Sequence, residues 1–291
     1  ASDTASSPAV KQAQYRPLSF GRWWPRLHPG VWVFAALVFV GSLVLLRDGG
    51  QDWRNDISPA ARAWWPAPWE EGLPLPPYAA LLMSPLGGLP VRQATAITNA
   101  LAVIVLALVI RQFGGPWWGV IPVMVSPPGI WLFTNGQTEW LVLSGLLFCN
   151  GLDLLLLSLK PQVGLWVGVA RLRRAGSDWP RYVAPAAIAV LLSLVLWPLW
   201  PLHLSRYSAG LLPAAWNASL WPWSLPLGAF FVWRAWQTGD DRYGLAASPL
   251  LFPYVNWPSY IGLLALLVSC WPRVTLAGWA VMWVGGTLLF F

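Results

Sequence analysis

Charged residues are scarce in this 291-residue chain, because Asp, Glu, Lys and Arg make up 10% of it and hydrophobic residues 57%. Soluble domains usually carry about 25% charged residues. The chain therefore has too few charges to cover a globular surface, and it is too apolar for a disordered protein. Its apolar runs also lack the alternation that is typical of lipid-facing barrel strands. The low charge content and the lack of alternation therefore indicate a helical membrane protein.

Cysteine and histidine, with two residues each, are nearly absent too. Cys149 and Cys270 lie in apolar runs without CxxC spacing, so we expect buried thiols and no disulfide framework. The sequence contains no His/Cys cluster and no nucleotide-binding loop, so it predicts neither a metal nor another cofactor. The net charge of +7 is scattered through short loops, which is typical of membrane topology rather than nucleic-acid binding.

Two residue types are unusually abundant, with 24 Trp and 28 Pro. Tryptophan anchors membrane proteins at the lipid–water interface, and that is the simplest explanation of its number. Stacking on a ligand such as a sugar ring is the alternative. Prolines inside apolar runs predict kinked and broken helices, which a membrane protein tolerates where neighbouring helices satisfy the freed backbone groups.

The distribution of charge predicts the topology. A polar arm, 1–30, carries four basic residues against one acidic, whereas the segment 47–75 carries three against five. The positive-inside rule therefore places the arm in the cytoplasm and 47–75 in an outer loop. The segment 171–181 carries four basic residues against one acidic and is placed inside. Residues 31–291 are expected to form a single transmembrane domain.

The apolar runs predict an all-α fold, a polytopic transmembrane helical bundle. At about 20 residues per crossing, there is room for about eight to ten membrane segments, some broken or re-entrant. Breaks are expected at the prolines of 116–133, at Asn150-Gly151 and Lys160-Pro161 within 138–172, and at the prolines of 245–271. The other helices are predicted near 31–46, 77–90, 94–110, 182–200, 221–236 and 274–291.

Lys160, one of only two lysines, lies within the apolar sequence LLLLSLKPQVGLW. A charge near the bilayer centre costs about 2.5–3.5 kcal/mol on insertion scales, so such residues are usually functional. A compact ammonium there would suit a phosphate or carboxylate ligand. The alternatives are a snorkelling side chain or a structural ion pair.

The outer loop contains Asp52 and Asp56, whose spacing would put both carboxylates on one face of a helix. Tryptophans follow, among them Trp64, so the loop is expected to fold onto the membrane surface. A carboxylate in such a partly desolvated place can act as a general base, although acidic loops are more often simply solvated. Asn135-Gly136-Gln137 and Glu139 adjoin a broken helix, where polar residues either line a cavity or cap a helix.

In order along the chain, these features resemble the integral-membrane glycosyltransferases of the C superfamily (GT-C). The nearest pattern is glycosyltransferase family eighty-seven, the polyprenyl-phosphate-mannose-dependent α-mannosyltransferases. Four stretches carry the resemblance: Asp56 followed by SPAARAWW, then PLPPYAALLMSPLGGLP at 74–90, Asn135-Gly136-Gln137, and Leu159-Lys160-Pro161-Gln162 with the Arg-rich turn after it. The resemblance covers roughly 56–175. Family members are usually longer, with more crossings, so this chain resembles a shortened form.

The resemblance implies an inverting transfer of a sugar from a polyprenyl phosphate to an acceptor hydroxyl on the outer face of a bacterial inner membrane. It implies Asp56 as the general base, with Asp52 as a rival. Lys160, together with Arg62, would bind the leaving phosphate. The other residues expected to bind substrate are Gln137, Gln162 and Trp64. Membrane lipids and the polyprenyl-phosphate sugar are the expected partners, and nucleic acid is not.

Two other interpretations remain open. A non-catalytic subunit built on the same fold would use its apolar and Trp-rich surface to pack against other membrane subunits. A transporter would show inverted repeats around broken helices. The broken segments 116–133 and 245–271 form one candidate pair, but the sequence shows no symmetry between them.

Overall fold

The computed structural model describes residues 27–65, 75–202 and 217–290. It is 78% helix, with no strand among those residues, so the predicted all-α class is confirmed. Most of the predicted cytoplasmic arm, 1–30, and the end of the predicted outer loop, 47–75, lie outside the described residues.

The unbroken helices form close to where the apolar runs predict them. They are α1 (Pro29–Leu45), α3 (Pro77–Gly87), α4 (Val91–Gln112), α10 (Trp179–Leu196), α12 (Leu225–Thr238) and α15 (Pro272–Phe290). The segment after α1, which we call the outer segment after its predicted location, is itself helical, as a π-helix, η3 (Trp53–Ile57), followed by α2 (Ser58–Arg62).

The three segments predicted to be broken are broken. The first contains α5 (Val120–Met124) and α6 (Pro127–Asn135). The second divides at both predicted places into α7 (Glu139–Ser144), α8 (Leu152–Ser158) and α9 (Pro161–Ala175). The third contains α13 (Asp241–Ala247), the 3₁₀-helix η10 (Trp257–Tyr260) and α14 (Ile261–Cys270).

Proline marks where helices begin more often than where they bend. It occupies the first turn of α1, α3, α6, α9, α10 and α12, whereas Pro85 and Pro185 lie inside helices. The first helical position suits proline because its missing N–H would have no helical partner there. The high proline content therefore reflects many short helices rather than kinked long ones.

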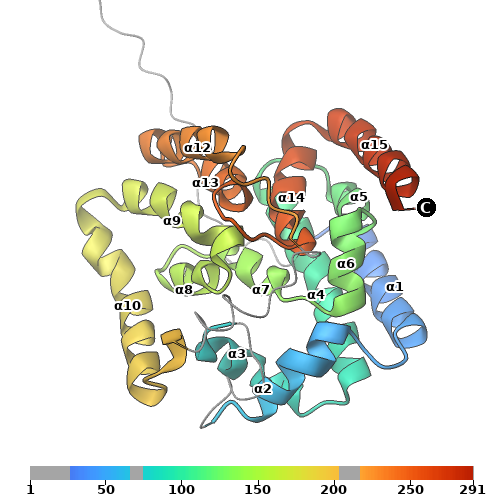
Figure 1. Ribbon diagram of the computed structural model, residues 1–291, viewed down its shortest axis with the longest axis horizontal. Helices are drawn as coiled ribbons and strands as arrows, with labels where there is room; N and C mark the ends of the chain where they lie inside the picture. The colour runs from blue at the N-terminus through green and yellow to red at the C-terminus, as the bar shows by residue number, and fades with distance from the viewer. Residues whose placement is uncertain (1–26, 66–74, 203–216, 291) are drawn as a thin grey trace, which may run out of the picture.

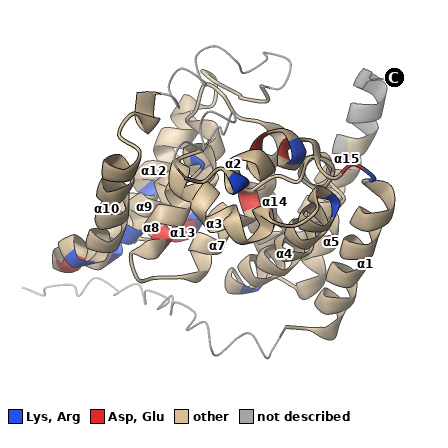
Figure 2. Ribbon diagram, turned by 90° about the horizontal axis from the view of Figure 1, so that it is seen from below, with Lys and Arg blue, Asp and Glu red and all other residues tan. Residues whose placement is uncertain are grey.

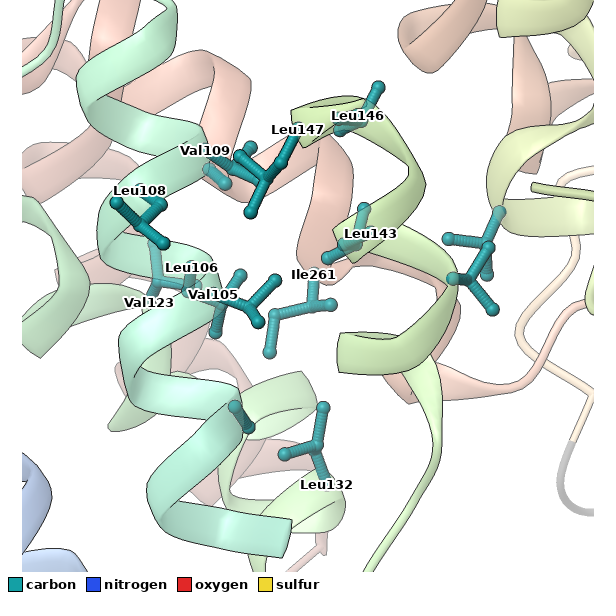
Figure 3. Close-up of a cluster of buried hydrophobic side chains, with 14 of the residues drawn as sticks. Val105, Leu106, Leu108, Val109, Val123, Leu132, Leu143, Leu146, Leu147 and Ile261 are labelled. Carbon is teal, nitrogen blue, oxygen red and sulfur yellow. The ribbon is translucent and has the colours of Figure 1, made fainter. Parts of the chain in front are cut away.

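Helix α4 lies at the centre of the bundle, packed against α1, α7 and α14 (Figure 1). Figure 3 shows Val105, Leu106, Leu108 and Val109 of α4 directed into a cluster completed by α6, α7, η6 (Gly145–Leu147) and α14. Small residues such as Ala102 and Ala107 are fully buried on α4 and let its neighbours approach closely.

By length and composition, two helical stretches of the described chain could cross a membrane, Val91–Gln112 and Pro161–Leu196. The first is mostly buried by other helices. The second includes α10, whose Ile188, Leu191 and Val195 are exposed, as they would be against lipid. Two shorter apolar helical stretches, Pro29–Leu45 and Trp257–Cys270, accompany them. The eight to ten membrane segments stay a prediction.

The expectation of two buried thiols was wrong for Cys149 and is met only in part by Cys270. Cys270 is partly buried, but Cys149 is exposed. The chain leaves η6 in extended conformation at Phe148 and turns at Asn150-Gly151, which places Cys149 in a connection rather than inside a helix. An apolar run in the sequence does not distinguish these two places.

Candidate functional site

A close backbone contact joins the outer segment to the turn between α6 and α7. The Gly50 N–H donates to Thr95 Oγ1 of α4 at 2.9 Å, and a Cβ at Gly50 would lie 2.5 Å from the Asn135 carbonyl oxygen. Gly136 ends α6 in the left-handed conformation (φ 68°), which favours glycine. This approach brings the start of the outer segment beside Gln137.

Four side chains from three parts of the chain then form one connected group. Gln137 Nε2 donates to Asp52 Oδ2, Lys160 Nζ donates to Gln137 Oε1 at 2.8 Å, and Lys160 Nζ also donates to Glu139 Oε1 at 2.8 Å. We call Asp52, Gln137, Lys160 and Glu139 the polar series. It connects a carboxylate of the outer segment, through a single amide, to the ammonium at the start of α9.

Asp52 is half-buried, and its environment favours the protonated form. Burial raises the pKa of Asp52 to about 6, and the charges of Asp56 and Glu139 add to the effect, while the Lys160 ammonium opposes it. A carboxyl group with a pKa near neutrality can both accept and release a proton at physiological pH.

Asp56 lies one turn further on, in the π-helix η3. It is half-buried, burial raises its pKa, and its charge acts on Asp52. The two carboxylates thus lie in one helical segment, close enough for their charges to interact. In the described structure the Gln137 amide nevertheless donates to Asp52 rather than to Asp56. Among the described residues this is the sole π-helix, a form often found at functional sites.

Lys160 is neither exposed nor snorkelling, since its side chain is 10% exposed and its ion-pair partner Glu139 is 0% exposed. The break before Pro161 makes Lys160 the residue that precedes α9, with an extended backbone that turns its side chain toward α7. Lys160 therefore forms a buried ion pair, which is one of the alternatives that the sequence leaves open. Glu139 was noted in the sequence only as a neighbour of Gln137, and nothing in the pattern identified it as the partner of Lys160.

The other predicted substrate-binding residues have no described bond to this group. Arg62 is exposed, and its Nε donates to the Gly87 carbonyl at 2.8 Å, which fastens α2 to α3. Trp64 is 37% exposed, and its ring centroid lies 6.3 Å from that of Trp65. Gln162 is half-buried in the first turn of α9.

Two tyrosines that the sequence did not single out lie near the polar series. The Tyr78 hydroxyl of α3 is 3.0 Å from Ser158 Oγ, two residues before Lys160. Tyr254, in the segment between α13 and α14, is close enough to Asp52 for the carboxylate charge to act on the phenol. Both phenols therefore approach the group from parts of the chain that are distant in sequence, Tyr78 from a helix and Tyr254 from a connecting segment.

A second group of buried charges lies further along α9, and sequence reasoning missed it. Arg171, predicted as part of an inner basic segment, has a side chain that is 1% exposed and forms ion pairs with Asp153 of α8 and Asp241 of α13. It also donates to the carbonyls of Gly145, Leu146 and Phe148. Figure 2 shows that basic and acidic residues meet where α9 adjoins α13. All described donors of this guanidinium are satisfied, so it is an anchor of the fold.

No group of three or more His, Cys, Asp or Glu side chains in the described residues could hold a metal ion. Compared with protein-family models, curated proteins and solved structures, the chain matches none.

Proposed function

We propose that the chain is a membrane-embedded glycosyltransferase that moves a sugar from a polyprenyl-phosphate donor to an acceptor hydroxyl, with inversion, and that Asp52 is the general base. The observation that carries the proposal is the polar series: a carboxyl group with a pKa of about 6 is joined through Gln137 to a buried ammonium. A base and a cation held at fixed separation are what this transfer requires.

The reaction follows from these two charges. Asp52 accepts the proton of the acceptor hydroxyl, whose oxygen attacks the anomeric carbon from the face opposite the phosphate. The bond from the anomeric carbon to the phosphate oxygen breaks, and its electron pair leaves with the phosphate. Lys160 stabilises the charge that develops on that phosphate. One displacement at the anomeric carbon inverts its configuration.

The contacts favour Asp52 over Asp56 as the base. Both carboxyl groups are half-buried in the same helical segment, but Asp52 is the one hydrogen-bonded to Gln137 and electrostatically coupled to Lys160. Asp56 then raises the proton affinity of Asp52 through its own charge. This assignment reverses the order that the family resemblance implies.

The location of the chain is part of the same proposal. We place it in a bacterial inner membrane with the N-terminus in the cytoplasm, eight to ten helical segments in the bilayer, and the polar series open to the outer face. The exposed apolar side chains of α1 and α10, among them Leu37, Val44 and Leu192, support burial of these helices in lipid.

The test is transfer of radiolabelled mannose from a polyprenyl phosphate by the purified protein. Asp52→Asn should lower the rate about 10²–10⁴-fold, the usual contribution of a general base. Asp48→Asn is the matched control, because Asp48 is an exposed carboxylate of the same segment whose contact is Arg54 at 3.9 Å. If Asp56→Asn abolishes transfer while Asp52→Asn does not, the base is Asp56. Full activity in both variants would refute the mechanism.

One observation favours a second candidate, a non-catalytic subunit of a larger membrane complex. Lys160 already has a buried carboxylate partner, as an ion pair with a purely structural role would have. Native mass spectrometry from gently solubilised source membranes separates the two proposals. A stoichiometric assembly without transferase activity would favour the subunit, and an isolated chain with turnover would favour the enzyme.

A further inference from the structure

The tripeptide Trp-Pro-Arg occurs three times in the chain, at 24–26, 179–181 and 271–273. The second occurrence forms the first residues of α10, and the third leads into α15, which begins at Pro272. The first occurrence precedes α1 and lies outside the described residues. Proline suits the first turn of a helix, so helix geometry explains its place in the tripeptide. The tryptophan and the arginine on either side of it need another reason.

The starts of α1 and α15 lie at the end of the bundle where α4 terminates, which we call the basic end. The ring of His28, directly before α1, stacks on Trp117, which follows α4, with the two centroids 4.2 Å apart. Ser269, at the end of α14, donates to the carbonyl of Ile110 in α4 at 3.3 Å, and α15 begins three residues later. Figure 1 shows α12 and α15 on this side of the molecule and α2 and α3 on the opposite side.

The start of α10 belongs to the same end. Gln112, the last residue of α4, donates to the carbonyl of Leu146 at 2.9 Å, and Arg171 donates to the same carbonyl at 3.1 Å. Arg171 and the Tyr182 hydroxyl of α10 both donate to Asp153. The buried charges of α9 thus connect the end of α4 to the start of α10.

Exposed arginines gather at the basic end. Arg181 and Arg273 are exposed, and so are Arg111 in the last turn of α4 and Arg173 in the last turn of α9. Within the described part of the chain, none of these four guanidinium groups has a hydrogen bond or an ion pair. Asp178 is an exposed carboxylate among them, and the other described carboxylates of this end are in ion pairs. The basic end therefore carries positive charge that the described protein does not neutralise.

Exposed tryptophans accompany these arginines. Trp179 and Trp271, the first residues of the two described tripeptides, are 53% and 60% exposed. The end of α12 also reaches this surface and exposes Trp236, since a Cβ at Gly239 would lie 2.7 Å from Cγ of Arg174. Indole rings prefer the headgroup level of a bilayer, and guanidinium groups form paired hydrogen bonds with phosphate. Together they fit the headgroup layer of a membrane that contains anionic phospholipid.

We propose that the basic end binds anionic phospholipid headgroups, and that Arg181 and Arg273 each hold the phosphate of one lipid beside the tryptophan of the same tripeptide. The guanidinium donates to the phosphate oxygens, and the indole lies at the level of the headgroups. The positive-inside rule assigns this end to the cytoplasmic leaflet. The inference rests on the membrane location in the proposed function but not on the transfer chemistry, so it holds for an enzyme and for a subunit alike.

The experiment is native mass spectrometry of the purified full chain in neutral detergent micelles, titrated with dioleoylphosphatidylglycerol or with dioleoylphosphatidylcholine. The wild-type chain should retain phosphatidylglycerol in preference to phosphatidylcholine. A double variant, Arg181→Gln with Arg273→Gln, should lower the affinity for phosphatidylglycerol about fivefold for each arginine removed and leave phosphatidylcholine binding unchanged. The matched control is Arg47→Gln with Arg54→Gln, at two exposed arginines of the outer segment, and should behave as wild type.

The outcomes separate this inference from the function. A wild-type chain without preference for phosphatidylglycerol, or an equal loss in the two double variants, would overturn the inference whatever the transferase assay gives. A preference that depends on Arg181 and Arg273 in a chain without transferase activity would support the inference and refute the enzyme. A short single-stranded DNA oligonucleotide is titrated in parallel. Binding of the oligonucleotide as tight as that of the lipid, and lost in the same double variant, would overturn the assignment to lipid.

Discussion

Replacing Arg171 by methionine should destabilise the fold more than any other single loss of charge in the described chain. The guanidinium is buried, and it donates to Asp153, to Asp241 and to three backbone carbonyls of the connection between α7 and α8. Methionine has a similar length but offers none of these donors. Both carboxylates are 0% exposed, so water cannot replace the missing partner.

The expected magnitude follows from what remains bonded. Asp153 keeps the Tyr182 hydroxyl and the Gly151 N–H, and Asp241 keeps Arg174 at 2.5 Å. Breaking a buried ion pair typically costs about 3–5 kcal/mol. Because both carboxylates keep these partners, we expect Arg171→Met to lower the unfolding free energy by about 4 kcal/mol. Because total stabilities are only about 5–15 kcal/mol, the change should be large in any unfolding assay.

The assay is unfolding in mixed detergent micelles, followed by tryptophan fluorescence. Arg173→Met, at an exposed position of the same helix, is the control and should lie within about 0.5 kcal/mol of wild type. A triple variant that also carries Asp153→Asn and Asp241→Asn should recover more than half of the loss, because it removes the unpaired charges. An Arg171→Met variant within about 1 kcal/mol of wild type would refute the argument that buried carboxylates depend on this guanidinium.

Four further predictions concern the polar series and the close approach at Gly50. Because the pKa of Asp52 is raised to about 6, transfer should rise with pH and reach half its maximum near pH 6. Because the pKa of Asp52 is raised, the protonated carboxyl stabilises the fold below pH 3.8, the ordinary pKa, and this contribution is lost as pH rises through 6. Asp52→Asn should therefore make the unfolding free energy less dependent on pH between these values, and an unchanged pH dependence would contradict the prediction. Gln137→Leu should separate Asp52 from Lys160 and lower transfer at least tenfold, about 1.4 kcal/mol, with little change in expression; wild-type rates would rule out the connection. Gly50→Ala should lower transfer because its Cβ would lie 2.5 Å from the Asn135 carbonyl oxygen. Gly41→Ala, whose Cβ would have no atom within 4 Å, should leave transfer unchanged and the stability equal or higher. Equal effects of the two substitutions on transfer would show that the close approach at Gly50 is unimportant.

Much of the helical layout could be predicted from the sequence because its signals are local. Proline and glycine mark the ends of α6, α8 and α9, and uninterrupted apolar runs define α1 and α4. These features depend on a few neighbouring residues, so the broken helices around Asn150-Gly151 and Lys160-Pro161 were found at the right places. Boundaries of long helices moved by only a few residues.

The partners of the charged residues could not be predicted in the same way. Lys160 and Glu139 are separated by 21 residues, and Arg171 and Asp241 by 70, so their pairing depends on how α7, α9 and α13 meet. Arg171 in particular was grouped with its exposed neighbours, since a basic cluster in sequence gives no sign that one member faces inward. Asp52 and Gln137 were both identified as candidates, but the close approach at Gly50 that joins them is visible only in three dimensions.

Helix α9 carries Lys160 immediately before its first residue and Arg171 within its length, about 16 Å apart along the axis at 1.5 Å per residue. One helix thus fixes the angle between two groups of buried charges, because each residue turns the chain by about 100°. If a single residue between them were deleted, Arg171 would keep its ion pairs with α8 and α13, and the Lys160 ammonium would be rotated away from Gln137 and Glu139. The segment between these two residues is therefore a spacer of fixed length, in which side chains can be exchanged but residues cannot be added or lost.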